Sequence, residues 1–235
     1  MVGNKTVNPD TYLIIPVYNE GKVIGGVIAG AIKQFQNVVC VDDGSQDESA
    51  AVIADSGARL IRHPINLGQG ASLQTGLEYA LRDQYVQYFV TFDADGQHRL
   101  EDAEKMVREL RQGDCDIVIG SRFLDSSTKV SPLKRNILKL ATIFGNVSSG
   151  TKLTDAHNGL RAFSRRFAEK LEITMPDMAH ASEITVLIGK SGLKYKEIPV
   201  TIHYSDYSKA KGQSLWNSVN IMFDLFFDYL TKGRK

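Results

Sequence analysis

The 235-residue sequence predicts an α/β protein with an open, mainly parallel sheet and helices on both of its faces. Up to about residue 120, short apolar runs alternate with segments of helical apolar spacing, and connections of this kind join parallel strands. Clusters of polar residues directly follow four of the predicted strands. Hydrophobic residues make up 43% of the chain and charged residues 23%, which is typical of a folded protein with a sizeable core.

Each predicted strand is a short run of apolar, often β-branched residues that ends at a turn signal. The first run ends at Pro16 and the polar residues after it, and the second ends at Asp42-Asp43-Gly44-Ser45. The last run carries Pro199, which lacks the N–H donor of a central strand and therefore indicates an edge position. In chain order the predicted strands are 12–17, 38–41, 59–62, 88–92, 115–119, 160–163 and 195–203.

Apolar spacing of about 3.6 residues predicts the helices. Gly25, Gly26 and Gly30 weaken the first of them, whereas Ser45 or Asp47 supplies an N-cap for the second. No repeat, low-complexity tract or linker interrupts the series, so residues 1–235 are expected to form a single domain. The predicted helices are 23–35, 47–56, 70–82, 100–112, 133–144, 165–172, 181–192 and 215–230.

Composition excludes several classes of protein. The 28 Lys and Arg residues against 27 Asp and Glu residues give a net charge of 28 − 27 = +1, which argues against a nucleic-acid-binding surface. Cys40 and Cys115 lie in apolar runs and are expected to be reduced core thiols. The polar residues 1–10 contain no secretory signal. The sequence also lacks a run of about 18 apolar residues, the length needed to span a bilayer. A cytoplasmic protein is therefore expected.

The polar clusters at 18–20, 42–45, 93–97 and 120–122 all follow predicted strand ends. In open parallel sheets, ligands bind outside the carboxyl ends of the strands. The sequence therefore locates a binding site at this edge of the sheet before its chemistry is considered.

Asp93-Ala94-Asp95 is the sharpest of these features. Two carboxylates one residue apart can hold a divalent ion such as Mg²⁺ and still leave coordination positions for substrate phosphates. Gln97 could supply a further oxygen. The alternative interpretation is a solvated turn, with an aspartate that caps the helix beginning near Leu100.

Three further segments accompany this pair of carboxylates. Pro16-Val17-Tyr18-Asn19-Glu20 offers an aromatic face and a carboxylate, and the carboxylates at 42–43 can accept hydrogen bonds from a ribose or a base. The glycines of Asn66-Leu67-Gly68-Gln69-Gly70 allow the backbone to approach a ligand closely. Taken singly, each segment is also compatible with an ordinary turn.

In this order and at these spacings, PVYNE, VDDGS, NLGQG, FDADGQH and IGSRF closely resemble the motifs of family 2 glycosyltransferases with a GT-A fold. The segments PLKRN, TDAHNGLRAFSR and EIPVTIHY are similar to polyprenyl-phosphate sugar synthases of the dolichol-phosphate mannose synthase type. The resemblance covers about residues 11–215. It implies a nucleotide-binding half at about 11–120 and an acceptor half at about 121–214, followed by the apolar segment 215–235.

The resemblance implies an inverting transfer of a hexose from a UDP- or GDP-hexose to a polyprenyl phosphate, with Mg²⁺ or Mn²⁺ as cofactor. Asp93, Asp95 and Gln97 match the metal-binding positions, with the Ala94 backbone nearby, and Arg122 and Arg135 match the arginines that bind the acceptor phosphate. The nucleoside pocket corresponds to Pro16, Tyr18, Glu20, Val41 and Asp43.

The chemistry of the residues agrees with this assignment. A metal ion neutralises a leaving diphosphate, and an anionic phosphate acceptor needs positioning by arginines but no base. A hydroxyl acceptor, as in polysaccharide or glycan synthesis, would instead require a general base, for which Glu183 and Asp155 are the candidates. Glu183 is also readily explained as a carboxylate on a helix face. A non-catalytic sugar-nucleotide-binding module is a third hypothesis, against which the intact pair of carboxylates argues.

The sequence departs from the subgroup at two places. The loop after the last strand lacks the usual arginine, so Lys209 or Lys211 would have to bind the donor diphosphate. His157 replaces a residue that is usually small, and either a ligand contact or a structural hydrogen bond would explain it. No paired ligand spacing assigns a metal to the remaining histidines, which are His63, His98, His180 and His203.

The predicted helix at 215–230 is rich in aromatic residues and is followed by Lys232, Arg234 and Lys235. Such a helix suits a membrane interface, and packing on the protein's own sheet or on a second subunit in a homo-oligomer explains it equally well. The helix at 133–144, with Lys134, Arg135 and Lys139, is a second candidate for a membrane surface. The expected location is peripheral, on the inner face of the membrane.

Overall fold

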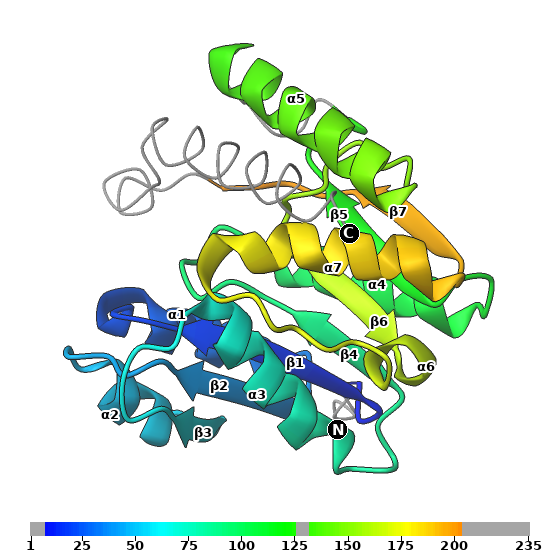
Figure 1. The fold of residues 1–235 in the computed structure, drawn as a ribbon. Helices are drawn as coiled ribbons and strands as arrows, with labels where there is room; N and C mark the ends of the chain where they lie inside the picture. The colour runs from blue at the N-terminus through cyan, green and yellow to red at the C-terminus, as the bar shows by residue number, and fades with distance from the viewer. Residues whose placement is uncertain (1–7, 126–131, 204–235) are drawn as a thin grey trace.

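The computed structural model describes residues 8–125 and 132–203. They form a seven-stranded sheet in the order β3-β2-β1-β4-β6-β5-β7 (Figure 1). Every pairing is parallel except those of β6, which runs antiparallel to β4 and β5. The strands are β1 (Thr11–Val17), β2 (Asn37–Asp42), β3 (Arg59–Arg62), β4 (Tyr88–Thr91), β5 (Ile117–Ser121), β6 (Arg161–Ser164) and β7 (Tyr195–Pro199).

Helices cover both faces of this sheet, as predicted (Figure 1). On one face lie α1 (Gly21–Ala31), α2 (Ser49–Ala54) and α4 (Leu100–Arg111). On the other lie α3 (Gln69–Leu81), α6 (Arg165–Ala168) and α7 (His180–Ser191), which begins after the short 3₁₀ helix Asp177–Ala179. Helix α5 (Pro132–Ser149) packs beside α7.

The alternation of side chains along the strands explains the two layers. Leu13 and Ile15 of β1 enter the core beneath α1 and α4, whereas Ile14 enters the core beneath α3. Because both faces of the strand are buried, its sequence is a continuous apolar run rather than an alternating one. The run predicted the strand, and its central position in the sheet explains why the run is continuous.

Several predicted boundaries differ from those observed by a few residues, including the end of α1 at Ala31 instead of 35 and the end of α5 at Ser149 instead of 144. Strand β7 lies at the edge of the sheet, as Pro199 indicated. It ends at Pro199, whereas the predicted strand continues to His203. The Val200 N–H still donates to the Ser121 carbonyl of β5 at 3.0 Å, and farther on the His203 N–H donates to the Gln97 carbonyl at 2.9 Å. Helix α6 is shorter than predicted because the residues after Ala168 continue in tighter turns, in which Lys170 N–H bonds to Phe167.

The glycines of the 66–70 segment have a packing role, and their predicted approach to a ligand stays a prediction. Gly68 has φ +95°, and a Cβ atom at Gly70 would lie 2.1 Å from the Met175 carbonyl oxygen. At Gly68 a Cβ atom would lie 2.7 Å from the Asp177 backbone nitrogen. Both glycines thus let the backbone of residues 175–177 pack against the start of α3.

Cys40 and Cys115 are buried free thiols, as predicted, and burial raises the pKa of Cys40 to about 12. Among the helices described, none combines the length and the apolar character that crossing a membrane requires. The predicted helix at 215–230 and the lysines Lys209 and Lys211 lie outside the described residues.

Replacing Gly70 with alanine is expected to lower the free energy of unfolding by about 1–3 kcal/mol, because the new methyl group overlaps a backbone carbonyl that cannot rotate away. Denaturant titration of the variant measures this change. The control is Gly26→Ala in α1, where nothing lies within 4 Å of the new Cβ atom. The free energy of unfolding of the control should rise by up to about 1 kcal/mol, because alanine has a higher helix propensity than glycine. Equal effects of the two substitutions would refute the close approach.

Candidate active site

The carboxyl ends of β1, β2, β4 and β5 lie at the same edge of the sheet because these strands run parallel to one another. The antiparallel strand β6 begins at this edge, so the loop before it joins the polar clusters of the other strands. Arg161, the first residue of β6, is paired with Thr91 of β4 and with Ile119 of β5. The structure therefore places residues 155–161 beside the predicted acidic motif.

Asp93 is held by one side chain from the start of α3 and one from its own turn. The Gln69 amide nitrogen donates to Asp93 Oδ1 at 3.2 Å, and His98 Nε2 lies 2.7 Å from Asp93 Oδ2. A Cβ atom on Gly159 would lie 2.4 Å from the same Oδ2, so the backbone before β6 presses against this carboxylate. The contacts fix the position of Asp93 from three directions.

Asp95 is bound mainly by its own turn. Its Oδ1 accepts the Gln97 backbone N–H at 3.0 Å, and its Oδ2 accepts the Gln97 side-chain amide at 2.5 Å. Gln97 therefore lies at the acidic motif as predicted, with its amide nitrogen directed toward Asp95. Its role as an oxygen ligand remains a prediction.

The two carboxylates differ in acidity. Burial raises the pKa of Asp93, but His98, with smaller contributions from His180 and Arg161, outweighs burial and holds the pKa below its usual range. Burial and the negative charge of Asp93 raise the pKa of Asp95. Asp93 is thus ionised at neutral pH, and a second negative charge beside it is costly unless a cation is shared.

This arrangement fits a divalent metal bound together with a diphosphate. Within the described ranges, no three His, Cys, Asp or Glu side chains are grouped as a complete protein-built metal site would require. Mg²⁺ needs no such group, since one or two carboxylates with substrate phosphates and water satisfy it. Asp93 and Asp95 are the residues that would hold the ion, and the repulsion between them is what the ion would relieve.

The residues predicted for a nucleoside pocket lie at the ends of β1 and β2. Pro16 and Val41 are direct neighbours in the parallel ladder, and the Tyr18 side chain is exposed just beyond them. Glu20 is buried, and its backbone N–H donates to Ser49 Oγ at 2.8 Å. Ala94 is buried beside the acidic motif.

Asp43 is buried, and its carboxylate already holds the loop that leads to α3. Its Oδ1 accepts the Leu67 N–H at 3.0 Å and lies 2.7 Å from His63 Nδ1, while its Oδ2 accepts the Gly68 N–H at 2.8 Å. His63 Nε2 in turn lies 3.0 Å from Thr75 Oγ1. These contacts give Asp43 a structural role, and its predicted nucleoside contact stays a prediction.

Arg122 forms a bidentate ion pair with Asp155. Arg122 Nε and Nη2 lie 2.6 and 2.7 Å from the two Asp155 oxygens, and the Arg122 backbone N–H donates to Oδ2 at 3.1 Å. Burial raises the pKa of Asp155, but Arg122 outweighs it and lowers the pKa overall. Asp155 therefore positions Arg122. Arg135 lies in α5, and its side chain is outside the described part of the structure.

Glu183, the other candidate base, binds the segment that precedes α7. Its carboxylate accepts the backbone N–H groups of Thr174 and Met175, at 3.0 and 2.9 Å, and the Thr174 hydroxyl at 2.5 Å. These bonds favour the interpretation of Glu183 as a structural carboxylate on a helix face.

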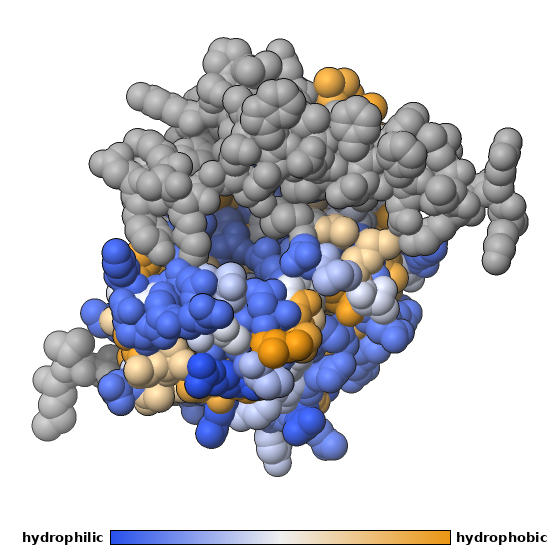
Figure 2. Space-filling view, turned by 60° about the vertical axis from the view of Figure 1, so that its left-hand side comes forward, coloured by the Kyte–Doolittle hydropathy of each residue, from blue (hydrophilic) through white to orange (hydrophobic). Residues whose placement is uncertain are grey.

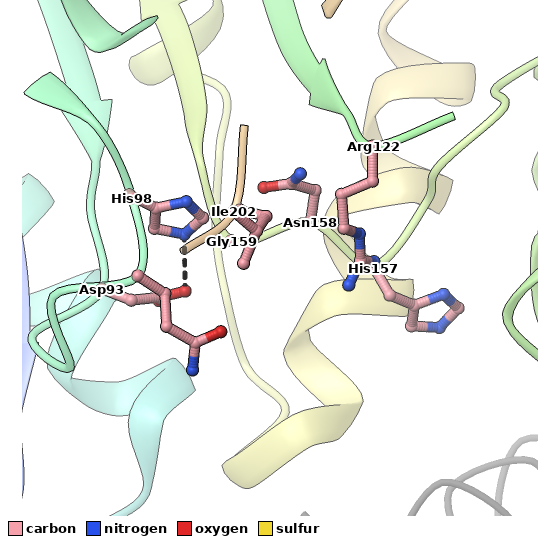
Figure 3. A pocket seen from close by; sticks show the side chains of 8 residues that line it. Asp93, His98, Arg122, His157, Asn158, Gly159 and Ile202 are labelled. Atoms are coloured by element: carbon pink, nitrogen blue, oxygen red, sulfur yellow. Dashed lines mark hydrogen bonds and ion pairs between the residues drawn. The ribbon is translucent and has the colours of Figure 1, made fainter. Parts of the chain in front are cut away.

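A small polar hollow lies between the two charged groups. Figure 3 shows Asp93 and His98 on one side of it and Arg122 on the other, with Asn158 and Gly159 between them. Gln97, His157 and Ile202 complete its lining. In Figure 2 the described surface on this side of the molecule is mostly hydrophilic, with apolar residues only in small groups.

Three residues at or near the site, His98, Asn158 and Arg161, were not predicted from the sequence. His98 stands in the same motif as Asp93, but a search for paired metal ligands passes over a histidine that binds a carboxylate. Arg161 is fully buried, and its Nη2 donates to the Ala156 carbonyl at 3.1 Å. An arginine inside a short apolar strand was the available signal, because a fully buried arginine is rare unless a negative charge lies near it.

A model of "Glycosyl transferase family 2" matches residues 12–172, more than half of the chain. The chain belongs to glycosyl transferase family 2. The glycosyltransferase is 30% identical to the UDP-N-acetylglucosamine–dolichyl-phosphate N-acetylglucosaminyltransferase of Methanococcus voltae, over 93% of this chain and 94% of that protein. It is also 30% identical to the polyprenol monophosphomannose synthase of Mycolicibacterium smegmatis, over 83% and 79% of the two chains.

Among solved structures, the glycosyltransferase resembles glucosyl-3-phosphoglycerate synthase of Mycobacterium tuberculosis in complex with Mn²⁺ and UDP-glucose. The TM-score is 0.68 at 17% identity, and the match covers 95% of this chain and 79% of the other. This likeness and the mainly parallel seven-stranded sheet confirm the predicted GT-A fold.

Replacing Asp155 with asparagine is expected to lower the free energy of unfolding at pH 7 by about 3 kcal/mol, because Arg122 is left without its buried partner. The pKa of Asp155 is lowered in the folded protein, so its stabilisation is fully present above the unfolded value of about 3.9 and is lost as the pH falls through the lower pKa of the folded state. In denaturant titrations, the difference between the two proteins should therefore be constant near pH 7 and begin to narrow as the pH approaches about 3.

The control for this comparison is Asp10→Asn. Asp10 pairs with Arg111 at 2.5 Å on the surface, and breaking an exposed pair should cost less than about 1 kcal/mol. A similar loss in both variants, or a difference for Asp155→Asn that does not depend on pH, would contradict the role assigned to Asp155.

Proposed function

We propose that this glycosyltransferase transfers a hexose from a UDP- or GDP-hexose to a polyprenyl phosphate, with Mg²⁺ or Mn²⁺ held by Asp93 and Asp95. The observation that carries the proposal is the hollow that joins Asp93 to Arg122. One side suits a metal-bound diphosphate, and the other side offers a guanidinium to an anionic acceptor.

In the proposed reaction, an oxygen of the acceptor phosphate forms a bond to C1 of the hexose. The bond from C1 to the donor diphosphate breaks, and the nucleoside diphosphate leaves with that electron pair. The acceptor oxygen is already anionic at neutral pH, so no residue has to remove a proton. When bound, the metal ion stabilises the charge of the leaving diphosphate as a Lewis acid.

The contacts of the two candidate bases support a phosphate acceptor over a hydroxyl acceptor. Both oxygens of Asp155 are bonded to Arg122, and the carboxylate of Glu183 is bonded to residues 174–175. A general base needs an oxygen within reach of the acceptor hydroxyl. Arg122, held in one orientation, instead suits a phosphate that only has to be positioned.

The names of relatives support the same acceptor class. The Methanococcus voltae relative is named for dolichyl phosphate and the Mycolicibacterium smegmatis relative for polyprenol. By this proposal Pro16, Tyr18, Glu20, Val41 and Asp43 form the nucleoside side of the site, near Ala94. Arg135 would join Arg122 at the acceptor phosphate, and Lys209 or Lys211 would bind the donor diphosphate.

A lipid-linked acceptor also requires a surface that meets the membrane, and we propose helix α5 for it. Leu140, Ile143 and Val147 are 58, 60 and 76% exposed at helical spacing, and Lys139 is exposed beside them. From Pro132 to Ser149 the helix contains three basic residues and no acidic residue. An apolar stripe with positive charge fits the anionic headgroups of a membrane on its inner face.

The direct test is a transfer assay with UDP-glucose, UDP-N-acetylglucosamine and GDP-mannose, with Mg²⁺ or Mn²⁺, and with or without a short polyprenyl phosphate. Product that forms only with the lipid supports the acceptor class and identifies the donor. Turnover that is indifferent to the lipid, and that Glu183→Gln abolishes, would instead establish a hydroxyl acceptor.

Replacing Asp95 with asparagine is expected to lower turnover at least about 100-fold, because the metal loses one of two carboxylates while the turn is retained. Calorimetric titration with Mn²⁺ and UDP should show weaker metal binding by the folded variant. Asp55→Asn, at an exposed acid after α2, is the matched control and should leave both quantities unchanged. Unchanged metal affinity in Asp95→Asn would refute the metal assignment.

Replacing Ile143 and Val147 together with glutamate is expected to reduce binding to vesicles with anionic lipid about tenfold, because the apolar stripe then carries negative charge. Co-sedimentation with phosphatidylcholine vesicles, with and without phosphatidylglycerol, measures the binding. Tyr85→Glu is the control, since Tyr85 is 90% exposed in the connection from α3 to β4. Equal losses in the two proteins, or no binding by the unmodified chain, would contradict docking through α5.

A further inference from the structure

Asn158 lies in the wall of the hollow, between Asp93 and Arg122 (Figure 3). Its side chain is buried, and its Oδ1 accepts the backbone N–H of Leu160 at 3.0 Å. This bond determines which end of the amide is the oxygen, so Nδ2 is fixed as the donor end. Nδ2 is buried and has no hydrogen-bond partner among the described residues.

A buried donor without an acceptor is uncommon in folded proteins and calls for an explanation. The bond to Leu160 accounts for Oδ1 of Asn158 but leaves Nδ2 unexplained. Its placement in the lining of the hollow supplies a reason, because a ligand there can provide the missing acceptor. The amide therefore indicates an oxygen atom on whatever occupies this part of the hollow.

The position of Asn158 indicates which part of the ligand carries this oxygen. The adjacent residue Gly159 approaches Asp93 so closely that a Cβ atom would lie 2.4 Å from its carboxylate. Arg122 lies across the hollow from Asp93. In a transfer reaction, the group between the leaving diphosphate and the attacking acceptor is the group that is transferred.

The neighbouring wall is uncharged as well as polar. Burial, with a smaller effect of Arg161, lowers the pKa of His157 to about 4, so this imidazole is neutral at pH 7. Its Nδ1 is also buried without a partner in the described structure, and its Nε2 lies 3.4 Å from Ser182 Oγ. A neutral amide and a neutral imidazole suit the hydroxyl or carbonyl oxygens of a sugar better than they suit a phosphate.

We propose that Asn158 Nδ2 donates a hydrogen bond to an oxygen of the transferred sugar and is thereby a specificity-determining residue for the donor. The inference rests on the nucleotide-sugar donor of the proposed function and is independent of the acceptor. A donor that lacks this oxygen leaves the amide unsatisfied, which is how a buried polar group discriminates against it.

The test compares the affinity for intact nucleotide-sugars with the affinity for the nucleotides alone. UDP, GDP, UDP-glucose, UDP-N-acetylglucosamine and GDP-mannose are titrated calorimetrically into the protein with Mn²⁺. Asn158→Ala should weaken the binding of the preferred nucleotide-sugar about tenfold, which is the effect of one lost hydrogen bond. The affinity for the nucleotide alone should change less than twofold. Thr91→Val is the matched control, because Thr91 Oγ1 donates to the Gly159 carbonyl at 2.7 Å and holds the same loop.

A second measurement uses the unmodified protein and donors with a single sugar hydroxyl replaced by hydrogen. One of these deoxy donors should bind the unmodified protein more weakly than the intact donor does. To Asn158→Ala, the same deoxy donor and the intact donor should bind with equal affinity. Equal weakening of nucleotide and nucleotide-sugar, or the same change in Thr91→Val, would show a structural role and overturn the proposal. A change confined to the KM for polyprenyl phosphate would assign the amide to the acceptor and overturn it too.

These outcomes separate this inference from the proposed function. If nucleotide-sugars bind with the expected selectivity but no polyprenyl phosphate accepts the sugar, the acceptor class is wrong and the role of Asn158 stands. If Asn158→Ala weakens the binding of no nucleotide-sugar more than that of its nucleotide, the role of Asn158 is wrong, whereas transfer to the lipid is still measured by its own assay.

Discussion

The antiparallel pairing of β6 between β4 and β5 is the constraint on which the site depends. A parallel strand in this position would deliver its carboxyl end to the site and its preceding loop to the far edge of the sheet. Because β6 runs the other way, the loop before it meets the turn after β4, and Gly159 is pressed against Asp93. The absence of a side chain at Gly159 is what permits this contact.

Around this contact, the charged groups are held by other protein groups rather than by solvent. Asp93 is bound by His98 and Gln69, and Arg122 is bound by Asp155. Each group is thus oriented before any ligand arrives, which lowers the cost of arranging it during a reaction. The loops that carry these residues are anchored in turn, as Asp43 anchors the segment that leads to Gln69.

Periodicity and turn signals predicted the strands, the helices on both faces and the edge at which the polar clusters meet. The parallel strands β1, β2 and β4 follow from the alternation of elements, so Asp93 could be placed at the site from sequence. The direction of β6 could not be predicted, because the apolar pattern of a short strand is the same in either orientation. The positions of Asn158 and Arg161 near the site depend on that direction, so they could not be predicted either. The contacts of Asp43 and Asp155 depend on long-range packing, so the sequence could suggest their chemistry but not which partners they bind.

The charge of Arg161 acts on two carboxylates at different places in the site. Arg161 is buried where its charge attracts both Asp93 and Asp155, the carboxylate that binds Arg122. In a poorly solvated interior, two acids that share one cation do not contribute independently, and loss of either one changes the environment of the other. Asp93 and Asp155, which are 62 residues apart in sequence, are therefore expected to be energetically coupled through Arg161.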